Sequence, residues 1–284
     1  MSKPLVIYHG NCADGFTAAW VANRFFSGVD RPTGWAIDIF PGVYGEDPPD
    51  CTDRAVYILD FSYTPEVMIN IAEKSQYTVW IDHHKTAIDA MGPYTHPKLT
   101  SHLSVERSGA YLTAQRLFGA DHDPEEIVKL VDDRDRWVFR DPRSKAFAAG
   151  MFSRHYTLEA WNALANDIDG TVAEGEAVLR KHWKDIHEKL DVMMVMADIA
   201  GETVPVANLS YMSASDACDE MLRRVPTAPF AATWFLRKDG KRVFSLRSRV
   251  GSDVDVGVIA KKFGGGGHKH ASGFAVVEWP GRSS

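Results

Sequence analysis

The stretch "VWIDHHKTA", from Val79 to Ala87, places an aspartate and two histidines directly after a short β-branched and aromatic run. Burying such polar, titratable side chains without partners is costly. Asp82, His83 and His84 must therefore be exposed, satisfy one another, or bind a ligand. We favour a ligand, because an acid and two histidines at the end of a strand have no simple packing role.

Two further strand-like runs end in side chains that bind metals. His9 ends "PLVIYH" and is followed by Cys12 and Asp14, and Asp60 ends "VYILD". Imidazole and carboxylate together suit Mn²⁺, Fe²⁺, Co²⁺ or Zn²⁺. The alternative is that Asp14 only caps the helix that follows it and that Asp60 is a turn residue.

A fourth acidic group lies in "LVDDRDRW", where Asp132, Asp133 and Asp135 crowd the end of a predicted helix. Acidic side chains are unfavourable at the negative end of a helix dipole, so a bound cation would relieve the conflict. The alternative is a solvated acidic turn whose carboxylates pair with Arg134 and Arg136.

A glycine-rich segment near the C-terminus, "GGGGHKHASG" at 264–273, is the fifth candidate. Glycines let the backbone approach a ligand closely and present successive N–H groups to an anion. A flexible linker is the alternative, but His268, Ser272 and an apolar strand follow at once. With Arg247 and Arg249 shortly before it, the segment predicts a phosphate-binding surface.

The bulk composition is that of a globular protein. The chain has 284 residues, of which 45% are hydrophobic and 25% charged, enough for one large domain or two smaller ones. No apolar run approaches the roughly 18 residues of a membrane span, and the start lacks a secretory h-region. The three cysteines form no CxxC pair, which argues against a disulfide framework or a zinc knuckle. We expect a cytoplasmic protein.

Charge is distributed unevenly along the chain. The formal net charge is −6, yet residues 221–270 hold eleven Lys or Arg against three Asp or Glu. A basic segment on an acidic chain suggests an anionic partner. A solvated basic face is the alternative.

Strand-like and helical runs alternate, which predicts an α/β fold with a mostly parallel sheet. We expect a helix-flanked sheet domain at 1–155, a helical connector at 156–198 and a smaller C-terminal α/β domain at 199–284. In such sheets, ligands gather outside the carboxyl ends of the strands. The side chains at the three strand ends should therefore meet at one edge.

Taken in order, the five segments resemble the DHH phosphoesterase superfamily, specifically its members with a C-terminal DHHA1 domain. That group includes RecJ-like single-strand nucleases, oligoribonucleases of the NrnA type and cyclic-dinucleotide phosphodiesterases. The resemblance covers nearly the whole chain. Its specific signal is the combination of "DHH" after a strand with "GGGGHKHASGF" near the C-terminus.

The resemblance implies two divalent cations, usually Mn²⁺, held between the two domains. Asp60 resembles the carboxylate that bridges both ions. The remaining roles that it implies are Asp14, His83 and Asp133 as ligands of one ion, His9 as a ligand of the other, His84 facing the scissile phosphate, and Asp82 orienting an adjacent histidine. In the DHHA1 segment, the residues expected to hold a terminal phosphate or nucleotide are Arg247, Gly265, Gly266, Gly267, His268 and Ser272.

The first motif departs from the family pattern. Cys12 stands where a second aspartate is usual, and His9 precedes Asp14 by five residues rather than six. A thiolate is softer than a carboxylate and favours Zn²⁺ or Fe²⁺ over Mn²⁺. The His9 site therefore holds a different metal, is weakly occupied, or uses Cys12 only for packing.

We expect a metal-dependent phosphodiesterase that cleaves short oligonucleotides or dinucleotides to mononucleotides, using water activated between two cations. A RecJ-like single-strand exonuclease and a cyclic-dinucleotide phosphodiesterase are the alternatives within this class. A non-hydrolytic nucleotide-binding module is the alternative outside it. The sequence leaves open whether the chain forms a homodimer.

Overall fold

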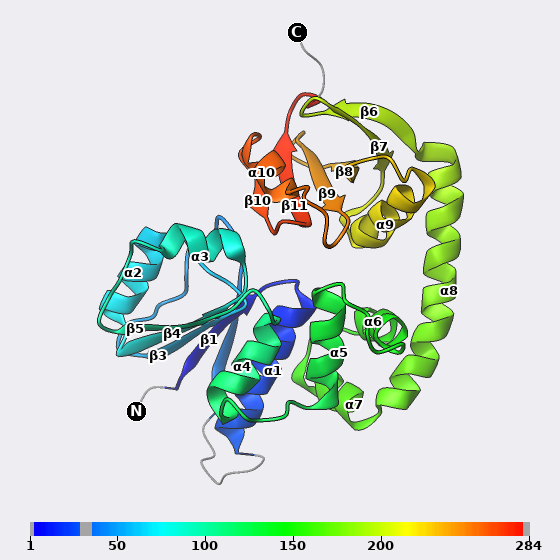
Figure 1. The fold of residues 1–284 in the computed structure, drawn as a ribbon. Helices are drawn as coiled ribbons and strands as arrows, with labels where there is room; N and C mark the ends of the chain where they lie inside the picture. The colour runs from blue at the N-terminus through cyan, green and yellow to red at the C-terminus, as the bar shows by residue number, and fades with distance from the viewer. Residues whose placement is uncertain (1–2, 29–35, 281–284) are drawn as a thin grey trace. The chain divides into compact units, whose positions relative to one another are not determined.

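The computed structural model describes residues 3–28 and 36–280. It divides into two compact units, Met1–Leu179 and Arg180–Ser284. Figure 1 shows both units coloured along the chain. Each unit contains its own sheet and its own apolar core, so each is described by itself.

The first unit is built on a five-stranded sheet in the order β2-β1-β3-β4-β5. Every neighbouring pair in it is parallel, as the alternation of strands and helices predicts. Its strands are β1 (Leu5–His9), β2 (Asp38–Gly42), β3 (Ala55–Leu59), β4 (Tyr77–Asp82) and β5 (Leu99–Leu103).

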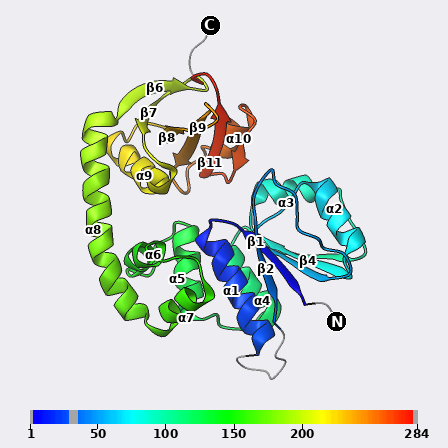
Figure 2. The same cartoon turned by 180° about the vertical axis from the view of Figure 1, so that it is seen from behind.

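Helices cover both faces of this sheet (Figures 1 and 2). One face packs in a core with α1, α4, α5, α6 and α7, and the other with α2 and α3. The helices are α1 (Ala13–Ser27), α2 (Pro65–Lys74), α3 (Lys85–Met91), α4 (Gly109–Phe118), α5 (Glu126–Asp135), α6 (Ser144–Phe152) and α7 (Leu158–Asn166).

Strand order brings three chemically active chain segments to one edge. His9 ends β1, Asp60 follows β3, and Asp82 ends β4. These three strands are neighbours and parallel, so their carboxyl ends lie side by side. Because a parallel sheet points all its strands the same way, the fold alone gathers these side chains.

The first unit continues past residue 155, the limit expected from the sequence. Trp161, on α7, is fully buried in the core of this unit, and its indole N–H donates to Thr17 on α1 at 2.9 Å. Helix α8 (Ile168–Met193) then spans the division between the two units. Helix α7 thus belongs to the core of the first unit, and the long helix α8 follows it.

The second unit holds a mostly antiparallel six-stranded sheet in the order β10-β11-β9-β8-β7-β6. Helix α9 packs on one face and α10 on the other. The elements are β6 (Val195–Ile199), β7 (Glu202–Asn208), a 3-10 turn (Tyr211–Ser213), α9 (Ala214–Arg224), β8 (Phe230–Leu236), β9 (Arg242–Ser248), α10 (Val256–Lys261), β10 (Gly266–Gly267) and β11 (Ala271–Val276).

Strands β8 and β9 form a hairpin, and Gly240 in its turn has a positive φ of 82°. Among the helices in the described part of the chain, none combines the length and the apolar character needed to cross a bilayer.

Candidate metal centre

Asp60 lies at the centre of the cluster formed at the carboxyl edge of the first sheet. It is 1% exposed, and its Oδ1 lies 3.1 Å from His83 Nε2 while its Oδ2 lies 3.5 Å from His9 Nδ1. The two oxygens of one carboxylate therefore face two different histidines. Its backbone has a left-handed φ of 55°, a strained conformation for a residue other than glycine.

Two sets of potential ligand atoms adjoin this carboxylate. One is His9, Asp60 and His84, and the other is Asp14, His83 and Asp135; within each set the atoms lie within 4.8 Å of one another. Asp60 Oδ1 and His9 Nδ1 are buried and, within the described part of the chain, have no hydrogen-bond partner. Imidazole nitrogens and carboxylate oxygens that converge in this way are ligands that a divalent cation accepts, so these residues fit a two-cation centre.

The pKa values of the side chains in the cluster are shifted because several carboxylates lie close together in a buried place. Burial, and then the Asp60 and Asp135 charges, raise the pKa of Asp14 well above its usual value. Burial lowers the pKa of His83, but Asp60, Asp135 and Asp14 outweigh it and raise that pKa to about 10. Burial acts to raise the pKa of Asp60, yet the neighbouring histidines hold it well below its usual value. Without a cation, a protonated His83 partly balances the carboxylates.

Asp82 holds His84 rather than facing the cluster itself. Its Oδ1 accepts the backbone N–H of His83 and of His84 at 2.7 and 3.1 Å, and lies 2.7 Å from His84 Nδ1. Trp80 Nε1 donates to the other oxygen at 3.3 Å. Because the Asp82 carboxylate accepts hydrogen bonds, it favours a proton on His84 Nδ1. The same hydrogen bond orients the ring so that Nε2 faces away from Asp82. Burial lowers the pKa of His84, but Asp82 raises it overall.

Asp14 does not cap its own helix. The N-cap of α1 is Cys12, and the Asp14 carboxylate instead accepts the backbone N–H groups of Gly109 and Ala110 at 2.6 and 3.1 Å. These are the first N–H groups of α4, which no intrahelical carbonyl can satisfy. A carboxylate there is favoured by the helix dipole. Asp14 thus ties α1 to α4 while one of its oxygens lies 3.8 Å from His83 Nε2.

Gly109 is required where it stands. A Cβ at this position would come within 2.5 Å of the Asp60 Cβ and 2.8 Å of its Oδ1. The first turn of α4 can therefore pack against Asp60 only because residue 109 has no side chain. Sequence reasoning missed this residue, because residues 60 and 109 meet only in the folded chain.

The three aspartates of α5 have three different roles. Asp132 is buried and accepts the backbone N–H of Ser108 at 2.7 Å, which anchors the start of α4. Asp133, the expected ligand, is not brought into the cluster. Its carboxylate accepts the backbone N–H groups of Arg140 and Asp141 at 2.9 and 3.1 Å, and the Ser144 hydroxyl at 2.5 Å.

Asp135 takes the place expected of Asp133, with its Oδ2 3.7 Å from His83 Nε2. Helical periodicity explains the difference. Asp132 and Asp135 are three residues apart and share one side of α5, whereas Asp133 lies about 100° round the helix from Asp132. The buried positions Val128 and Val131 mark the same side and were the available signal.

Cys12 lies at the cluster without joining either set of ligand atoms. Its thiol is 3.6 Å from Asp60 Oδ2 and donates to it. Burial, followed by the Asp60, Asp135 and Asp14 charges, raises the pKa of the thiol well above its usual value. In the absence of a cation Cys12 is therefore a neutral hydrogen-bond donor to the central carboxylate.

In the second unit, the residues expected to bind phosphate make hydrogen bonds to other residues of the same unit. The Arg247 guanidinium donates to Ser215 Oγ at 3.0 and 3.2 Å, and Arg249 donates to carbonyls at the end of α9 and just after it. The Ser272 hydroxyl is buried and donates to the Val256 carbonyl at 2.6 Å. The backbone N–H of His268 donates to the Ala271 carbonyl at 2.7 Å.

The glycine run also has a packing role. A Cβ at Gly265 would come within 2.1 Å of the Gly273 carbonyl oxygen, and one at Gly267 within 2.6 Å of the Ala271 carbonyl oxygen. At Gly266 it would meet no atom within 4 Å. Gly265 and Gly267 are therefore required for β10 to approach β11, whatever else the segment binds.

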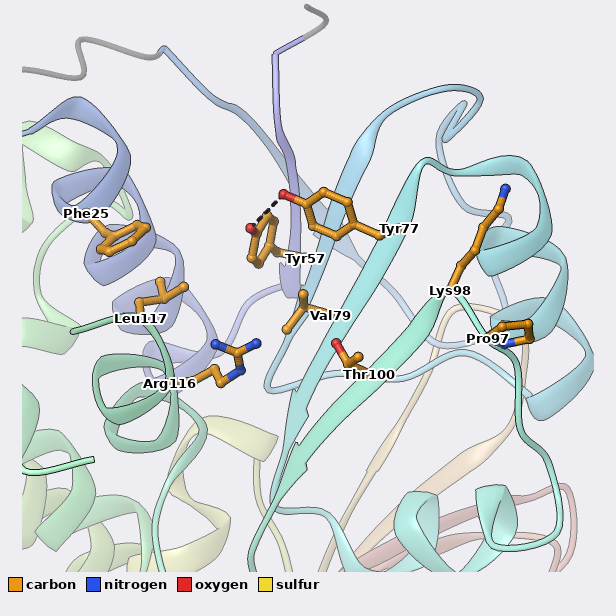
Figure 3. Close-up of a pocket in the computed structure, with 9 residues that line it drawn as sticks. All are labelled: Phe25, Tyr57, Tyr77, Val79, Pro97, Lys98, Thr100, Arg116 and Leu117. Carbon is orange, nitrogen blue, oxygen red and sulfur yellow. Dashed lines mark hydrogen bonds between the residues drawn. The ribbon is translucent and has the colours of Figure 1, made fainter. Parts of the chain in front are cut away.

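A separate cavity of about 310 Å³ lies away from the cluster (Figure 3). Its floor is a row of side chains across β3, β4 and β5, namely Tyr57, Val79 and Thr100, and its walls come from the ends of α1 and α4. Tyr77, which also lines it, is the first residue of β4, whereas Asp82 is the last. The lining contains no carboxylate, histidine or cysteine, so the chemistry belongs to the cluster and not to this cavity.

Comparison with known proteins supports the architecture. No protein-family model matches the chain. Among curated proteins it is similar to R106, an uncharacterized protein of Acanthamoeba polyphaga mimivirus, with 26% identity over 293 residues, covering 95% of this chain and 67% of that protein.

Three solved structures share the fold. The DHH domain of a member of the s1p family of ribosomal proteins has a TM-score of 0.54 at 13% identity, covering 95% of this chain and 82% of that chain. The pGpG-specific phosphodiesterase PggH of Vibrio cholerae has a TM-score of 0.52 at 15% identity, covering 97% and 93%. RecJ of Thermus thermophilus, in complex with Mn²⁺, has a TM-score of 0.50 at 15% identity, covering 96% of this chain and 49% of RecJ. The chain therefore shares the fold of these three structures, one of which is described as a DHH domain.

The close approach of α4 to Asp60 predicts that Gly109→Ala weakens divalent cation binding. The added methyl group displaces the Asp60 carboxylate, and we expect Mn²⁺ affinity to fall at least about tenfold, the lower end of the cost of disturbing an outer-shell partner. Isothermal titration calorimetry measures it. Gly92→Ala is the matched control, since a Cβ there meets its nearest atom at 3.3 Å. Equal affinities for the two variants would contradict the role of Gly109.

The raised pKa of His83 predicts that cation binding strengthens with pH. Below a pKa of about 10 the metal-free imidazole keeps its proton, and a cation must displace it to bind. We expect Mn²⁺ affinity to rise about tenfold per pH unit between pH 6 and 8.5 for each proton displaced. Calorimetry in two buffers of different protonation enthalpy counts the released protons. Affinity that does not change over this range would show that His83 is no ligand.

Proposed function

We propose that this protein is a divalent-metal-dependent phosphodiesterase that hydrolyses short oligonucleotides or dinucleotides to mononucleotides. The observation that carries the proposal is Asp60, a buried carboxylate whose Oδ1 lies 3.1 Å from His83 Nε2 and whose Oδ2 lies 3.5 Å from His9 Nδ1, two histidines that belong to different sets of ligand atoms. A carboxylate in this position is suited to bridge a pair of cations. Such pairs recur in phosphatases and nucleases.

Asp14, Asp60, His83 and Asp135 would hold one cation, and Asp60 with His9 the other. We propose Mn²⁺ for both positions, with Zn²⁺, Fe²⁺ or Co²⁺ as the alternatives that a Cys12 ligand would favour. When bound, the cations would supply an activated water and neutralise charge on the phosphoryl oxygens. The role of Asp135 replaces the one first expected of Asp133.

His84 is proposed to contact the scissile phosphate. Asp82 fixes the ring through Nδ1 at 2.7 Å and raises the pKa of the imidazole, which favours its protonated form. A protonated imidazole donates a charge-assisted hydrogen bond to a phosphoryl oxygen and stabilises charge that develops there. Asp82 is thus a positioning residue that acts through His84.

A nucleotide substrate is supported by the fold and by charge. The solved structures that share the fold include a pGpG-specific phosphodiesterase and RecJ. The basic segment of the second unit, which includes Arg247 and the glycine run with His268, is proposed to bind the substrate's terminal phosphate. Phosphate contacts of this kind make affinity fall with added salt.

The proposal predicts Mn²⁺-dependent hydrolysis of a 5′-labelled dinucleotide to mononucleotides. We expect Asp135→Asn to reduce the rate by more than about 100-fold, because losing even an outer-shell partner of a metal costs 10- to 100-fold. Asp133→Asn is the matched control, since that carboxylate binds a loop rather than the cluster. It should keep the rate within about tenfold of the wild type.

Alternative substrates are tested in the same assay. A labelled 20-mer and a cyclic dinucleotide are offered beside the dinucleotide, with Mn²⁺, Zn²⁺, Fe²⁺ or Co²⁺. Preference for the 20-mer would identify a single-strand exonuclease, and preference for the cyclic substrate a cyclic-dinucleotide phosphodiesterase. If nucleotides bind but none of the substrates is hydrolysed with any of the metals, the protein is a non-hydrolytic nucleotide-binding module and the proposed enzymatic activity is wrong.

A further inference from the structure

Tyr44 stands beside the metal centre on a turn that the sequence encodes. Strand β2 ends at Gly42, directly beside His9 in the register of the sheet. The chain then turns, with the Glu46 N–H donating to the Val43 carbonyl at 3.1 Å and Gly45 at a φ of 88°. A glycine with positive φ at the third position is the signature of a type II turn. Tyr44 is the second residue of this turn, so its side chain is held by local backbone geometry.

The ring of Tyr44 packs against a candidate ligand and against the residue after Asp60. Its centroid lies 5.5 Å from that of His9, edge to face at 72°, and 4.8 Å from that of Phe61, tilted by 45°. Phe61 is fully buried. Contacts at these distances are those of favourable aromatic pairs, so the ring has a fixed orientation.

Although it is anchored on these two rings, Tyr44 is 56% exposed. The other exposed aromatic side chains in the described part of the first unit, Tyr77, Tyr94 and Phe152, are each less exposed. Folding alone would favour a smaller or more polar residue on such a turn. A rigid, half-uncovered ring beside a phosphate-handling centre is instead suited to contact a ligand.

We propose that Tyr44 stacks against the nucleobase adjoining the scissile phosphate. This inference rests on the proposed function. It adds recognition of the nucleobase, the group that distinguishes a nucleotide from other phosphodiesters. Nucleobases stack on exposed aromatic side chains in a largely sequence-tolerant way. With the phosphate held by the cluster that contains His9, the next group along the substrate is a nucleoside, and the Tyr44 ring is in contact with His9.

The surroundings of the hydroxyl agree with a stacking role for the ring. The structure gives no hydrogen bond for this hydroxyl among the described residues, so we assign the function to the ring face and expect the hydroxyl to be dispensable.

Steady-state kinetics on two substrates test the assignment. One is a dinucleotide, and the other is the same phosphodiester with abasic sugars. We expect Tyr44→Leu to raise KM for the dinucleotide roughly 5- to 150-fold, the range for loss of one stacked base, and to leave kcat largely unchanged. For the abasic substrate the same variant should match the wild type. Tyr44→Phe and Tyr44→Trp should keep the low KM for the dinucleotide.

Tyr77→Leu is the matched control. This tyrosine is 42% exposed but lies at the start of β4, the end of the strand opposite Asp82, so neither substrate should be affected. A dinucleotide KM unchanged in Tyr44→Leu would overturn the inference, and so would equal losses on both substrates or a loss in Tyr44→Phe. If the wild type cleaves neither substrate with any metal, the proposed function itself has failed. These results are therefore distinguishable.

Discussion

The crowding of carboxylates around Asp60 is the constraint on which the rest of the first unit depends. Asp14, Asp60 and Asp135 all approach His83, and both Asp14 and Asp60 are 1% exposed. Buried like charges destabilise a fold unless something opposite in charge balances them. A protonated His83 supplies part of that balance in the metal-free chain, and cations supply it when bound. The side chains of the cluster are therefore better suited to binding cations than to forming ion pairs with one another.

The surrounding backbone keeps these side chains in place. Asp14 from α1 receives the first N–H groups of α4, and Asp132 from α5 receives the N–H of Ser108 just before them. The start of α4 is therefore fixed by carboxylates from two other helices. In turn its Gly109 packs against Asp60, whose left-handed backbone costs of order 1–3 kcal/mol. Strain of that size persists where neighbours over-determine the conformation.

Much of this arrangement follows from the sequence. Alternating runs predict a parallel sheet, and strand ends that carry His9, Asp60 and Asp82 must then meet at one edge. The structure brings these segments together, and Asp82 Oδ1 lies 2.7 Å from His84 Nδ1. The DHH-type fold is likewise supported by solved structures of low identity.

The features that the sequence did not predict depend on contacts between segments that are far apart in the chain. Gly109 and Tyr44 become informative only when α4 meets Asp60 and the turn after β2 meets His9. Asp135 rather than Asp133 approaches His83, which follows from the position of each residue around α5. Gly265 and Gly267 pack backbone against backbone, a need that a run of glycines cannot reveal by composition.

The most direct test of the bridging carboxylate is the number and coupling of bound ions. Calorimetry gives the stoichiometry of Mn²⁺ per chain, and electron paramagnetic resonance reports whether the ions interact. We predict two Mn²⁺ ions per chain with an exchange-coupled spectrum, as expected for ions about 3.5–4 Å apart, and loss of that coupling in Asp60→Asn. One ion per chain, two uncoupled ions in the wild type, or an unchanged spectrum in Asp60→Asn would contradict the central role of Asp60.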